Sequence, residues 1–287
     1  MIIVADSGST KADWLLINRE GETIAEFHTK GFNPFFHDRD FILNELNANY
    51  ELNNYAEEIE EVHFYGAGVS SEELQEKIRI AFRQYFTNAK LNVGHDLDAA
   101  AFASGDINTP SIACILGTGS NSCWFTGTEV IEDAPALGYI LGDEGSGSYF
   151  GKLLLQEYFY KKMPKHISKR MEEKYGITKA NVFENVYMKP NANVYLASFS
   201  RFLSDNKEEL YITKLVEKGL LIFIDLHVCR YPEYRNVKTH FIGSISFFFE
   251  DILRNVAKRR GVDVGRVLKK PIYNLAKYHS MSSQENV

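Results

Sequence analysis

The sequence predicts an α/β protein made of two related lobes with a cleft between them. One observation is a repeated unit: MIIVADSGSTKADW and SIACILGTGSNSCW share an order of apolar strand, small-residue loop and second strand that ends in Trp. Aligning Trp14 with Trp124 places residues 7–10 over residues 117–120. The other observation is that strand-like and helix-like apolar periods both occur along the chain, which indicates sheets and helices packed in layers.

The length fits two domains. Single hydrophobic cores usually stop growing at about 250 residues, and this chain has 287. Because the repeated unit restarts near Ile112, we expect an N-terminal lobe over residues 1–108 and a C-terminal lobe over residues 109–287.

The N-terminal lobe is expected to open with a meander. Three strands are predicted in this order: Ile2–Ala5, Trp14–Asn18 and Thr23–His28. Their short loops argue against a dinucleotide-binding start, in which a strand feeds directly into a helix.

Further elements complete this lobe. They are a helix over Asp40–Tyr50, a strand over residues 61–68, a helix over residues 74–86 and a strand that passes into an Ala-rich helix in NVGHDLDAAAFA. Ser70 with Glu73 is typical of a capping box before the second of these helices. Asp96 and Asp98 fall at the final strand–helix junction.

The C-terminal lobe repeats the opening over Ile112–Phe125. A Gly-rich run at 137–151 and a mostly helical region over 149–219 follow, broken near Pro164 and Pro190. We interpret the apolar run at 220–228 and the segment THFIG as strands. In residues 244–261 the apolar side chains fit one helix face: Phe248, Ile252, Leu253 and Val256.

Composition excludes several function classes. The formal net charge of −6 and the pI near 5.8 argue against a nucleic-acid partner, because phosphate neutralisation needs clustered Lys and Arg. No run approaches the roughly 18 apolar residues of a membrane span, so we expect no membrane association. Three cysteines without CxxC spacing, Cys114, Cys123 and Cys229, indicate neither a zinc site nor an iron–sulfur cluster. A first strand beginning at Met1 leaves no room for a signal peptide, and we expect a cytoplasmic protein.

The two small-residue loops suggest phosphate binding. Gly, Ser and Thr between two strands present backbone N–H groups and hydroxyls in an array that holds phosphate oxygens. No GxxxxGK[ST] motif occurs, so neither loop is a Walker A loop. A single such hairpin is more often a plain β-turn; a matching pair could clamp a polyphosphate from both sides.

Charged residues near these loops fit phosphoryl transfer, which needs a metal ion and a carboxylate to receive a proton. Asp6 is placed to hold Mg²⁺, and Lys11 could reach a phosphate. Asp96 stands where a general base would be needed, although a helix N-cap is the alternative. Asp98 shares that ambiguity and is the weaker candidate.

Two further stretches are candidates for substrate contact. In GDEGSGS, Asp143 and Glu144 open a helix, where carboxylates are commonly just favourable with the helix dipole. Three glycines there hold the backbone open, as a loop against a ligand requires. In GFNPFF, Asn33 offers donors and an acceptor to sugar hydroxyls, and Phe35 or Phe36 could cover a sugar ring; alone, GFNP would be a turn.

Together these motifs resemble the sugar-kinase, heat-shock-protein-70 and actin superfamily, and within it the BadF/BadG/BcrA/BcrD-type ATPases that include N-acetylglucosamine kinase. DSGSTK resembles the first phosphate loop, GTGSN the second, HDLDAAA the catalytic segment, LGDEGSGSYFG the most distinctive motif and FIGSISFFF the adenosine loop. The resemblance covers nearly the whole chain. It implies two lobes of ribonuclease H-like, actin-like ATPase fold around a central cleft.

The resemblance also implies phosphorylation of an amino sugar by ATP and Mg²⁺, in particular of N-acetylglucosamine at its 6-hydroxyl. It assigns Asp96 as the catalytic base and Asp6 to the metal. The implied sugar-binding residues are Asn33, Gly142, Asp143 and Glu144. The implied phosphate- and nucleotide-binding residues are Ser9, Thr10, Lys11, Gly117, Thr118, Gly119, Gly243 and Ser244.

Other functions stay open on the sequence alone. One is a BadF-type ATPase that activates a partner dehydratase, and another is an assembly module without sugar kinase activity. Glucosamine and N-acetylmuramic acid are alternative substrates. The oligomeric state is open as well, and a homodimer is common in families of this kind.

Overall fold

The strands form two sheets of five strands each within the part of the chain that the structure describes, residues 1–8 and 10–284. The structure is a computed structural model. The strands of the first sheet are β1 (Ile2–Ser7), β2 (Lys11–Ile17), β3 (Thr23–Lys30), β4 (Glu61–Gly66) and β5 (Lys90–His95). Those of the second are β6 (Ser111–Leu116), β7 (Ser120–Phe125), β8 (Val130–Ile131), β9 (Lys238–Ile242) and β10 (Asp263–Leu268).

Both sheets have the same topology. The first has the order β3-β2-β1-β4-β5, and the second, read from its opposite end, has the order β8-β7-β6-β9-β10. In each, an antiparallel meander of three strands is continued by two strands parallel to the first. The expectation of a mixed α/β fold with two related halves is therefore confirmed.

The chain divides into two units at places that differ from the expected break after residue 108. Residues 1–104 and the segment from Lys270 onward form one unit, and Gly105–Lys269 form the other. The C-terminal segment returns to the first unit because its helix packs on β1, β2 and the helix Asp96–Ser104. Sequence periodicity carries no signal for that return.

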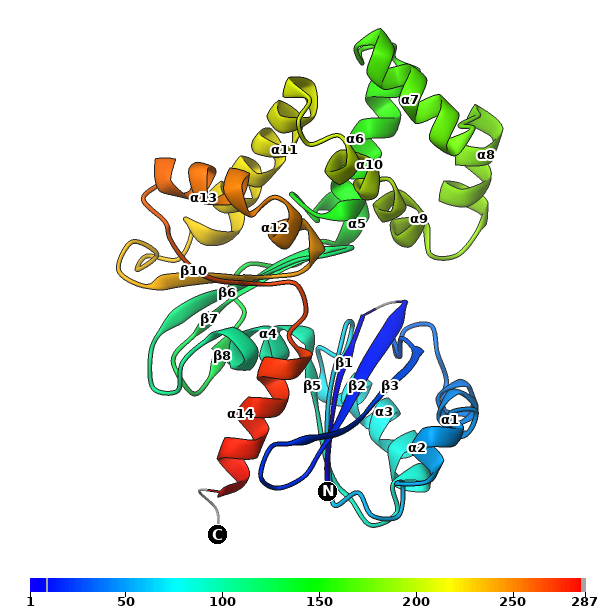
Figure 1. Cartoon of the computed structure of the whole chain (residues 1–287), viewed down its shortest axis with the longest axis vertical. Helices are drawn as coiled ribbons and strands as arrows, with labels where there is room; N and C mark the ends of the chain where they lie inside the picture. The colour runs from blue at the N-terminus through cyan, green and yellow to red at the C-terminus, as the bar shows by residue number, and fades with distance from the viewer. Residues whose placement is uncertain (9, 285–287) are drawn as a thin grey trace. The chain divides into compact units, whose positions relative to one another are not determined.

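Helices cover both faces of the first sheet (Figure 1). They are α1 (Arg39–Asn47), α2 (Tyr50–Asn53), α3 (Glu72–Tyr85), α4 (Asp96–Ser104) and α14 (Ile272–Gln284). The predicted capping box at Ser70 is wrong by one residue: Ser71 is the N-cap of α3 and accepts from the Leu74 N–H. Glu73 is then N2 and cannot complete a capping box.

Trp14 is the centre of the core of the first unit. Its ring lies 5.9 Å from the rings of Phe64 and Phe82 and 6.1 Å from that of Phe32. The indole N–H donates to Thr29 Oγ1 at 3.0 Å, so the one polar atom of this buried side chain is satisfied.

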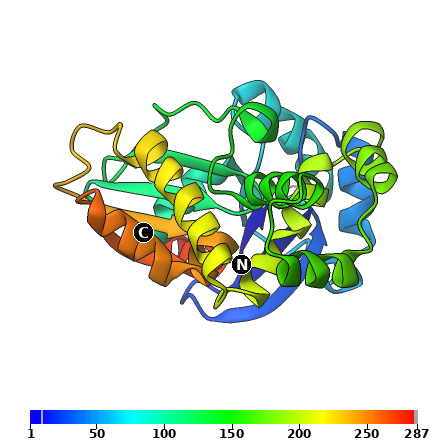
Figure 2. The same cartoon turned by 90° about the horizontal axis from the view of Figure 1, so that it is seen from above.

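The second unit carries a long helical insertion between β8 and β9. Its helices are α5 (Gly138–Leu141), α6 (Gly147–Phe159), α7 (Lys165–Tyr175), α8 (Lys179–Phe183), the π-helix η1 (Glu184–Met188), α9 (Ala192–Ser198), α10 (Ser200–Asp205), α11 (Leu210–Phe223) and the π-helix η2 (Ile224–Val228). After β9 come α12 (Ser244–Phe248) and α13 (Glu250–Arg259). Helices α11 and α13 lie side by side (Figure 2), and both contribute to a core that includes Phe150, Phe223 and Phe241.

Two predictions for this unit are wrong. The apolar run at 220–228 is not a strand, because it continues α11 into η2. The single helix predicted over 244–261 is two helices separated at Phe249, and Phe248 is exposed, whereas Leu253 and Val256 are buried. In the described residues no helix is long and apolar enough to cross a membrane.

Candidate active site

The carboxyl ends of β1, β4 and β5 lie at one edge of the first sheet, because these three strands are parallel. Asp6 is the last residue but one of β1, and Asp96 follows β5 directly. Ser7 ties the loop before α1 to the same edge, since its Oγ accepts from the Phe32 N–H at 2.9 Å. The sheet therefore brings together three sequence-predicted segments that are distant along the chain.

Asp6 has an unusual electrostatic environment. Burial raises the pKa of its carboxyl to about 7, and the negative charges of Asp96 and Asp13 add to the effect, while Lys270 opposes it. Desolvation and like charges both disfavour an ionised carboxylate. A cation at this edge would relieve the same repulsion.

Asp13 joins two lysines beside Asp6. It lies directly opposite Asp6 in the β1–β2 register, and its two carboxylate oxygens contact Lys11 Nζ at 2.7 Å and Lys270 Nζ at 2.8 Å. Burial alone would raise the pKa of Asp13, but the hydrogen bonds from the two lysines outweigh burial and hold that pKa below its usual value. Sequence reasoning missed Asp13 and Lys270, and Lys11 is engaged by a carboxylate of its own hairpin.

The two aspartates at the start of α4 have different surroundings. Asp98 Oδ2 accepts from the His95 backbone N–H at 2.9 Å, which is the reciprocal bond of a helix N-terminus. Asp96 is the first residue of the helix, and its Oδ1 lies 3.0 Å from His95 Nε2. Asp98 therefore makes a capping bond at the start of α4, and the carboxylate of Asp96 lies beside the His95 ring.

Asn33 is buried in a local turn. Its Oδ1 accepts from the Phe35 N–H at 3.0 Å, and a Cβ on Gly68 would lie 2.9 Å from that oxygen. Gly68 has φ +80°, so the close approach uses a backbone conformation that favours glycine. Phe35 and Phe36 are both exposed.

In the second unit, the loop between β6 and β7 contacts the start of α6. The Gly117 N–H donates to the Gly119 carbonyl at 3.0 Å. The carbonyls of Gly117 and Thr118 accept from the backbone N–H groups of Gly147 and Ser148 at 2.8 and 3.0 Å. The second predicted phosphate loop is thus held by the distinctive Gly-rich motif. Thr10 lies in the corresponding loop of the first unit, and Ser9 lies outside the described residues.

Asp143 lies against this loop. It has φ +58°, a conformation that side chains other than glycine seldom adopt. Its carboxylate accepts from the Ser120 N–H and the Ser148 hydroxyl, both at 3.3 Å, and a Cβ on Gly119 would lie 3.1 Å from both oxygens. Burial raises the pKa of Asp143, although the two serines oppose the shift.

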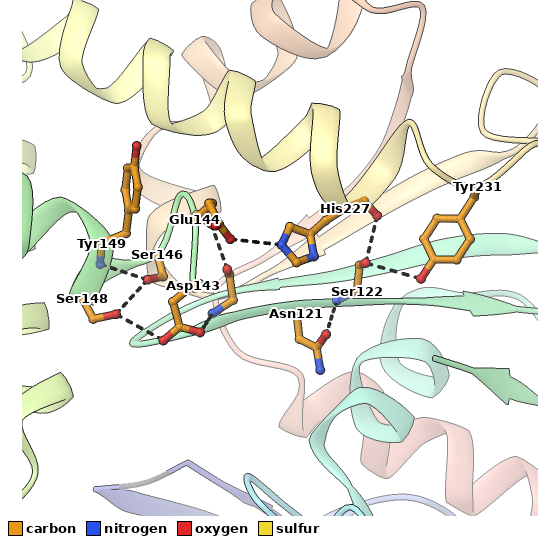
Figure 3. A network of polar contacts seen from close by, with 10 residues as sticks. Asn121, Ser122, Asp143, Glu144, Ser146, Ser148, Tyr149, His227 and Tyr231 are labelled. Carbon is orange, nitrogen blue, oxygen red and sulfur yellow. Dashed lines mark hydrogen bonds and ion pairs between the residues drawn. The ribbon is translucent and has the colours of Figure 1, made fainter. Parts of the chain in front are cut away.

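A buried polar network continues from this turn to η2 (Figure 3). Glu144 Oε2 lies 3.4 Å from His227 Nε2, and the two side chains point toward each other. Ser120 Oγ donates to the Glu144 carbonyl at 2.8 Å, and Ser122 Oγ donates to the His227 carbonyl at 2.9 Å. The His227 ring stacks on Phe223. Sequence reasoning placed Ser120 within the second small-residue loop and missed Ser122 and His227. The alternation of Ser120 and Ser122 on one face of β7 is a signal for the serines, but not for His227.

Two further predicted site residues of the second unit are glycines, Gly142 and Gly243. Gly142 is the C-cap of α5, and its N–H donates to the Gly138 carbonyl at 2.8 Å. Gly243 has φ +122°, and a Cβ there would lie 2.4 Å from the Leu116 carbonyl oxygen. The predicted adenosine loop, with Ser244 as the first residue of α12, therefore lies directly beside the second phosphate loop.

Among the described residues, no group of three or more His, Cys, Asp or Glu could hold a metal ion. Mg²⁺ is usually bound by one or two carboxylates together with substrate phosphates and water. Burial, and after it the negative charges of Asp96 and Asp13, raise the pKa of Asp6. A single carboxylate such as that of Asp6, completed by phosphate oxygens and water, fits a hard divalent cation of this kind.

The fold and much of the sequence are shared with a solved protein of Porphyromonas gingivalis that is provisionally named an N-acetylglucosamine kinase. The two chains are 36% identical, with a TM-score of 0.93, over 99% of this chain and 100% of that one. The chain belongs to the sugar-kinase superfamily.

Other solved sugar kinases share the fold at lower identity. A protein of Chromobacterium violaceum, also provisionally named an N-acetylglucosamine kinase, is 16% identical with a TM-score of 0.71, over 96% of this chain and 98% of that one. A ROK-family glucokinase of Streptomyces griseus, solved with glucose and AMPPNP, is 15% identical with a TM-score of 0.58, over 99% of each chain. No protein-family model and no curated protein sequence matches the chain.

Proposed function

We propose that this sugar-kinase superfamily member transfers the γ-phosphoryl group of ATP to the 6-hydroxyl of N-acetylglucosamine. The observation that carries the proposal is the repeated sheet, in which a small-residue loop joins the first two strands of both halves, in a chain 36% identical to the Porphyromonas gingivalis protein. Assignment to the BadF/BadG/BcrA/BcrD-type branch and to a ribonuclease H-like fold is part of the same proposal, supported by the order of the motifs.

In the first unit, Asp96 accepts the proton of the sugar hydroxyl as that oxygen attacks the γ-phosphorus. Its place directly after β5, at the edge of the sheet that also carries Asp6, supports that role. Asn33 orients the sugar, and Thr10 and Lys11 contact the phosphates. Mg²⁺, held through Asp6, would neutralise charge on the phosphate oxygens.

In the second unit, the backbone at Gly117–Gly119 lies against the phosphates, and Gly243 and Ser244 lie along the nucleoside. Gly142, Asp143 and Glu144 contact the sugar. A Cβ added at Gly119 would lie only 3.1 Å from the Asp143 oxygens, so the Asp143 carboxylate packs directly on the backbone of the phosphate loop. A movement of the sugar-binding turn would therefore move the phosphate loop as well. Sugar binding would then order the loop that holds the phosphate.

The test is ADP release from Mg·ATP with N-acetylglucosamine, glucosamine, N-acetylmannosamine, N-acetylmuramic acid and glucose. We expect the largest kcat/KM with N-acetylglucosamine and loss of the sugar-dependent signal in Asp96→Asn. A sugar-independent ATPase, or no turnover with any of the five, would contradict the proposal and favour an activator or an assembly module. A higher kcat/KM for another sugar would correct the substrate and keep the kinase.

A further inference from the structure

Two ammonium groups share one recessed carboxylate next to the first loop. Lys11 Nζ contacts Asp13 Oδ1, and Lys270 Nζ contacts Asp13 Oδ2. The Asp13 side chain is 14% exposed, whereas those of Lys11 and Lys270 are 50% and 45% exposed. The carboxylate is therefore recessed, and both cations reach solvent.

The two lysines supply more positive charge than is needed to neutralise the Asp13 carboxylate. One lysine balances the charge of one carboxylate, and His28 Nδ1 also lies 2.9 Å from Asp13 Oδ1. Partly exposed ion pairs contribute only about 0–1 kcal/mol to stability, so stability gives little reason for a second lysine from the far end of the chain. A lysine ammonium has three donors, and Lys270 can contact Asp13 while it also donates to a phosphate oxygen.

The location fits a phosphate ligand. Asp13 lies opposite Asp6, and Lys270 acts electrostatically on Asp6 as well. Lys270 follows β10 and precedes α14, so the chain delivers it to the β1–β2 hairpin through tertiary structure alone.

We propose that Lys270 is a second phosphate-binding cation of the first loop and that Asp13 is the residue that positions it, an inference that rests on the proposed kinase function. Asp13 holds the ammonium at the edge of the hairpin before nucleotide arrives. The Lys270 side chain is then already ordered when the phosphate binds, so the contact costs less side-chain conformational entropy.

The test compares Lys270→Gln with Lys30→Gln. Lys30 is a matched control because it lies in the same unit, is exposed and contacts a carboxylate, Glu45, at 2.7 Å. With Lys270→Gln we expect the KM for ATP to rise roughly 10-fold or more, the loss typical of one charge-assisted hydrogen bond, and the KM for N-acetylglucosamine to stay unchanged. Lys30→Gln should leave both constants unchanged, and Lys270→Arg should restore much of the ATP affinity.

Calorimetric binding of inorganic tripolyphosphate and of Mg·ADP separates this inference from the kinase proposal. Both probes should bind more weakly to Lys270→Gln than to wild type, whether or not a sugar is phosphorylated. Asp13→Asn, which keeps both lysines, should weaken binding of the same probes by less than Lys270→Gln does. Equal affinities for wild type, Lys270→Gln and Lys30→Gln would overturn the role of Lys270; unchanged affinity in a folded Asp13→Asn would overturn the positioning role.

Discussion

Gly243 is a position at which the backbone leaves no room for a side chain. Its φ of +122° disfavours any other residue, and an added Cβ would lie 2.4 Å from the Leu116 carbonyl oxygen. We expect Gly243→Ala to lower the free energy of unfolding of the second unit by about 2 kcal/mol or more, through strain and displacement of β6.

Gly117→Ala is the control for this substitution, because a Cβ there meets nothing within 4 Å. Chemical denaturation of both variants measures the difference. Similar midpoints for Gly243→Ala and Gly117→Ala would show that the connection between β9 and α12 adapts without cost.

We expect Asp96 and Asp98 to have different roles although they stand two positions apart. Asp98→Asn weakens the bond to the His95 N–H and should lower the free energy of unfolding by about 0.5–1 kcal/mol. Asp96→Asn should lower kcat by about 10² or more, the usual contribution of a general base, with little change in stability or in nucleotide affinity. Paired measurements of kcat and unfolding decide this, and near-normal turnover in Asp96→Asn would remove it from the mechanism.

The local sequence pattern was enough to predict the positions of some of these residues but not of others. The strand-to-helix change in HDLDAAA was enough to predict where Asp96 stands, which the structure places at the end of β5. Asp13 lies opposite Asp6, but this pairing depends on the hairpin register, which the turn length sets. Lys270 could not be found at all, because its partner Asp13 is distant in sequence and no periodicity encodes a tertiary ion pair.

The run LLIFIDLHV shows why a short apolar segment is ambiguous between strand and helix. Its composition favours a strand, but the buried residues Ile212, Val216, Leu220 and Phe223 recur every three or four positions from the preceding segment. A longer window would have revealed the helix. Strand β10 was missed because DVGRVL has too little strand character: it contains Gly265 and an exposed arginine, and it is an edge strand in which no residue is buried.

Helix α14 contacts the first sheet through a buried histidine pair. The rings of His63 and His279 are stacked 3.7 Å apart, and His279 Nε2 lies 3.0 Å from the Tyr65 hydroxyl. Burial, together with His63, lowers the pKa of His279 to about 2. Burial also lowers the pKa of His63, although its contact with Glu61 opposes the shift.

Because the pKa values of both histidines are lowered in the folded protein, we expect its stability to decrease in acid. Histidines in the unfolded chain take up protons below about pH 6.5, whereas His279 in the folded protein stays neutral until about pH 2. The stabilisation is therefore complete above pH 6.5 and decreases as the pH falls toward 2, by at most about 1.4 kcal/mol per pH unit for each histidine.

Unfolding by denaturant at pH 7.5 and pH 5 measures this loss. His279→Gln should reduce the difference between the two pH values. The control His166→Gln, at an exposed histidine paired with Glu209, should preserve it. A wild-type protein that is equally stable at both pH values would contradict the prediction.

The repetition of one sheet topology is the part of the architecture that the two loops made predictable. The loops are not identical: Gly8 donates to the Lys11 carbonyl, whereas Gly117 donates to the Gly119 carbonyl two residues on. The second turn is one residue shorter, so Trp14 and Trp124 are not equivalent in register, and only Trp14 is fully buried. The composition and order of the two segments were therefore enough to find the repeat. Its residue-by-residue alignment required the register of the paired strands in the structure.

The return of the C-terminal segment makes the first unit depend on both ends of the chain. In α14, Tyr278 stacks on Phe102 with the ring centroids 4.7 Å apart, and Asn274 Nδ2 donates to the Ala103 carbonyl at 3.0 Å. A chain that ends at Lys269 would expose the α4 face and the Tyr65 hydroxyl, and each large side chain uncovered costs about 1.5–3 kcal/mol.

We therefore expect this truncation to abolish protection from hydrogen exchange across residues 1–104 and to leave the strands of the second sheet protected. Exchange read peptide by peptide contains its own control, because both units are measured in one sample. Retained protection of β1 and β4 would show that the N-terminal segment folds without α14. Equal loss in β6 and β9 would show that the two units fold as one cooperative structure, and the division at residues 104 and 270 would then have no energetic meaning.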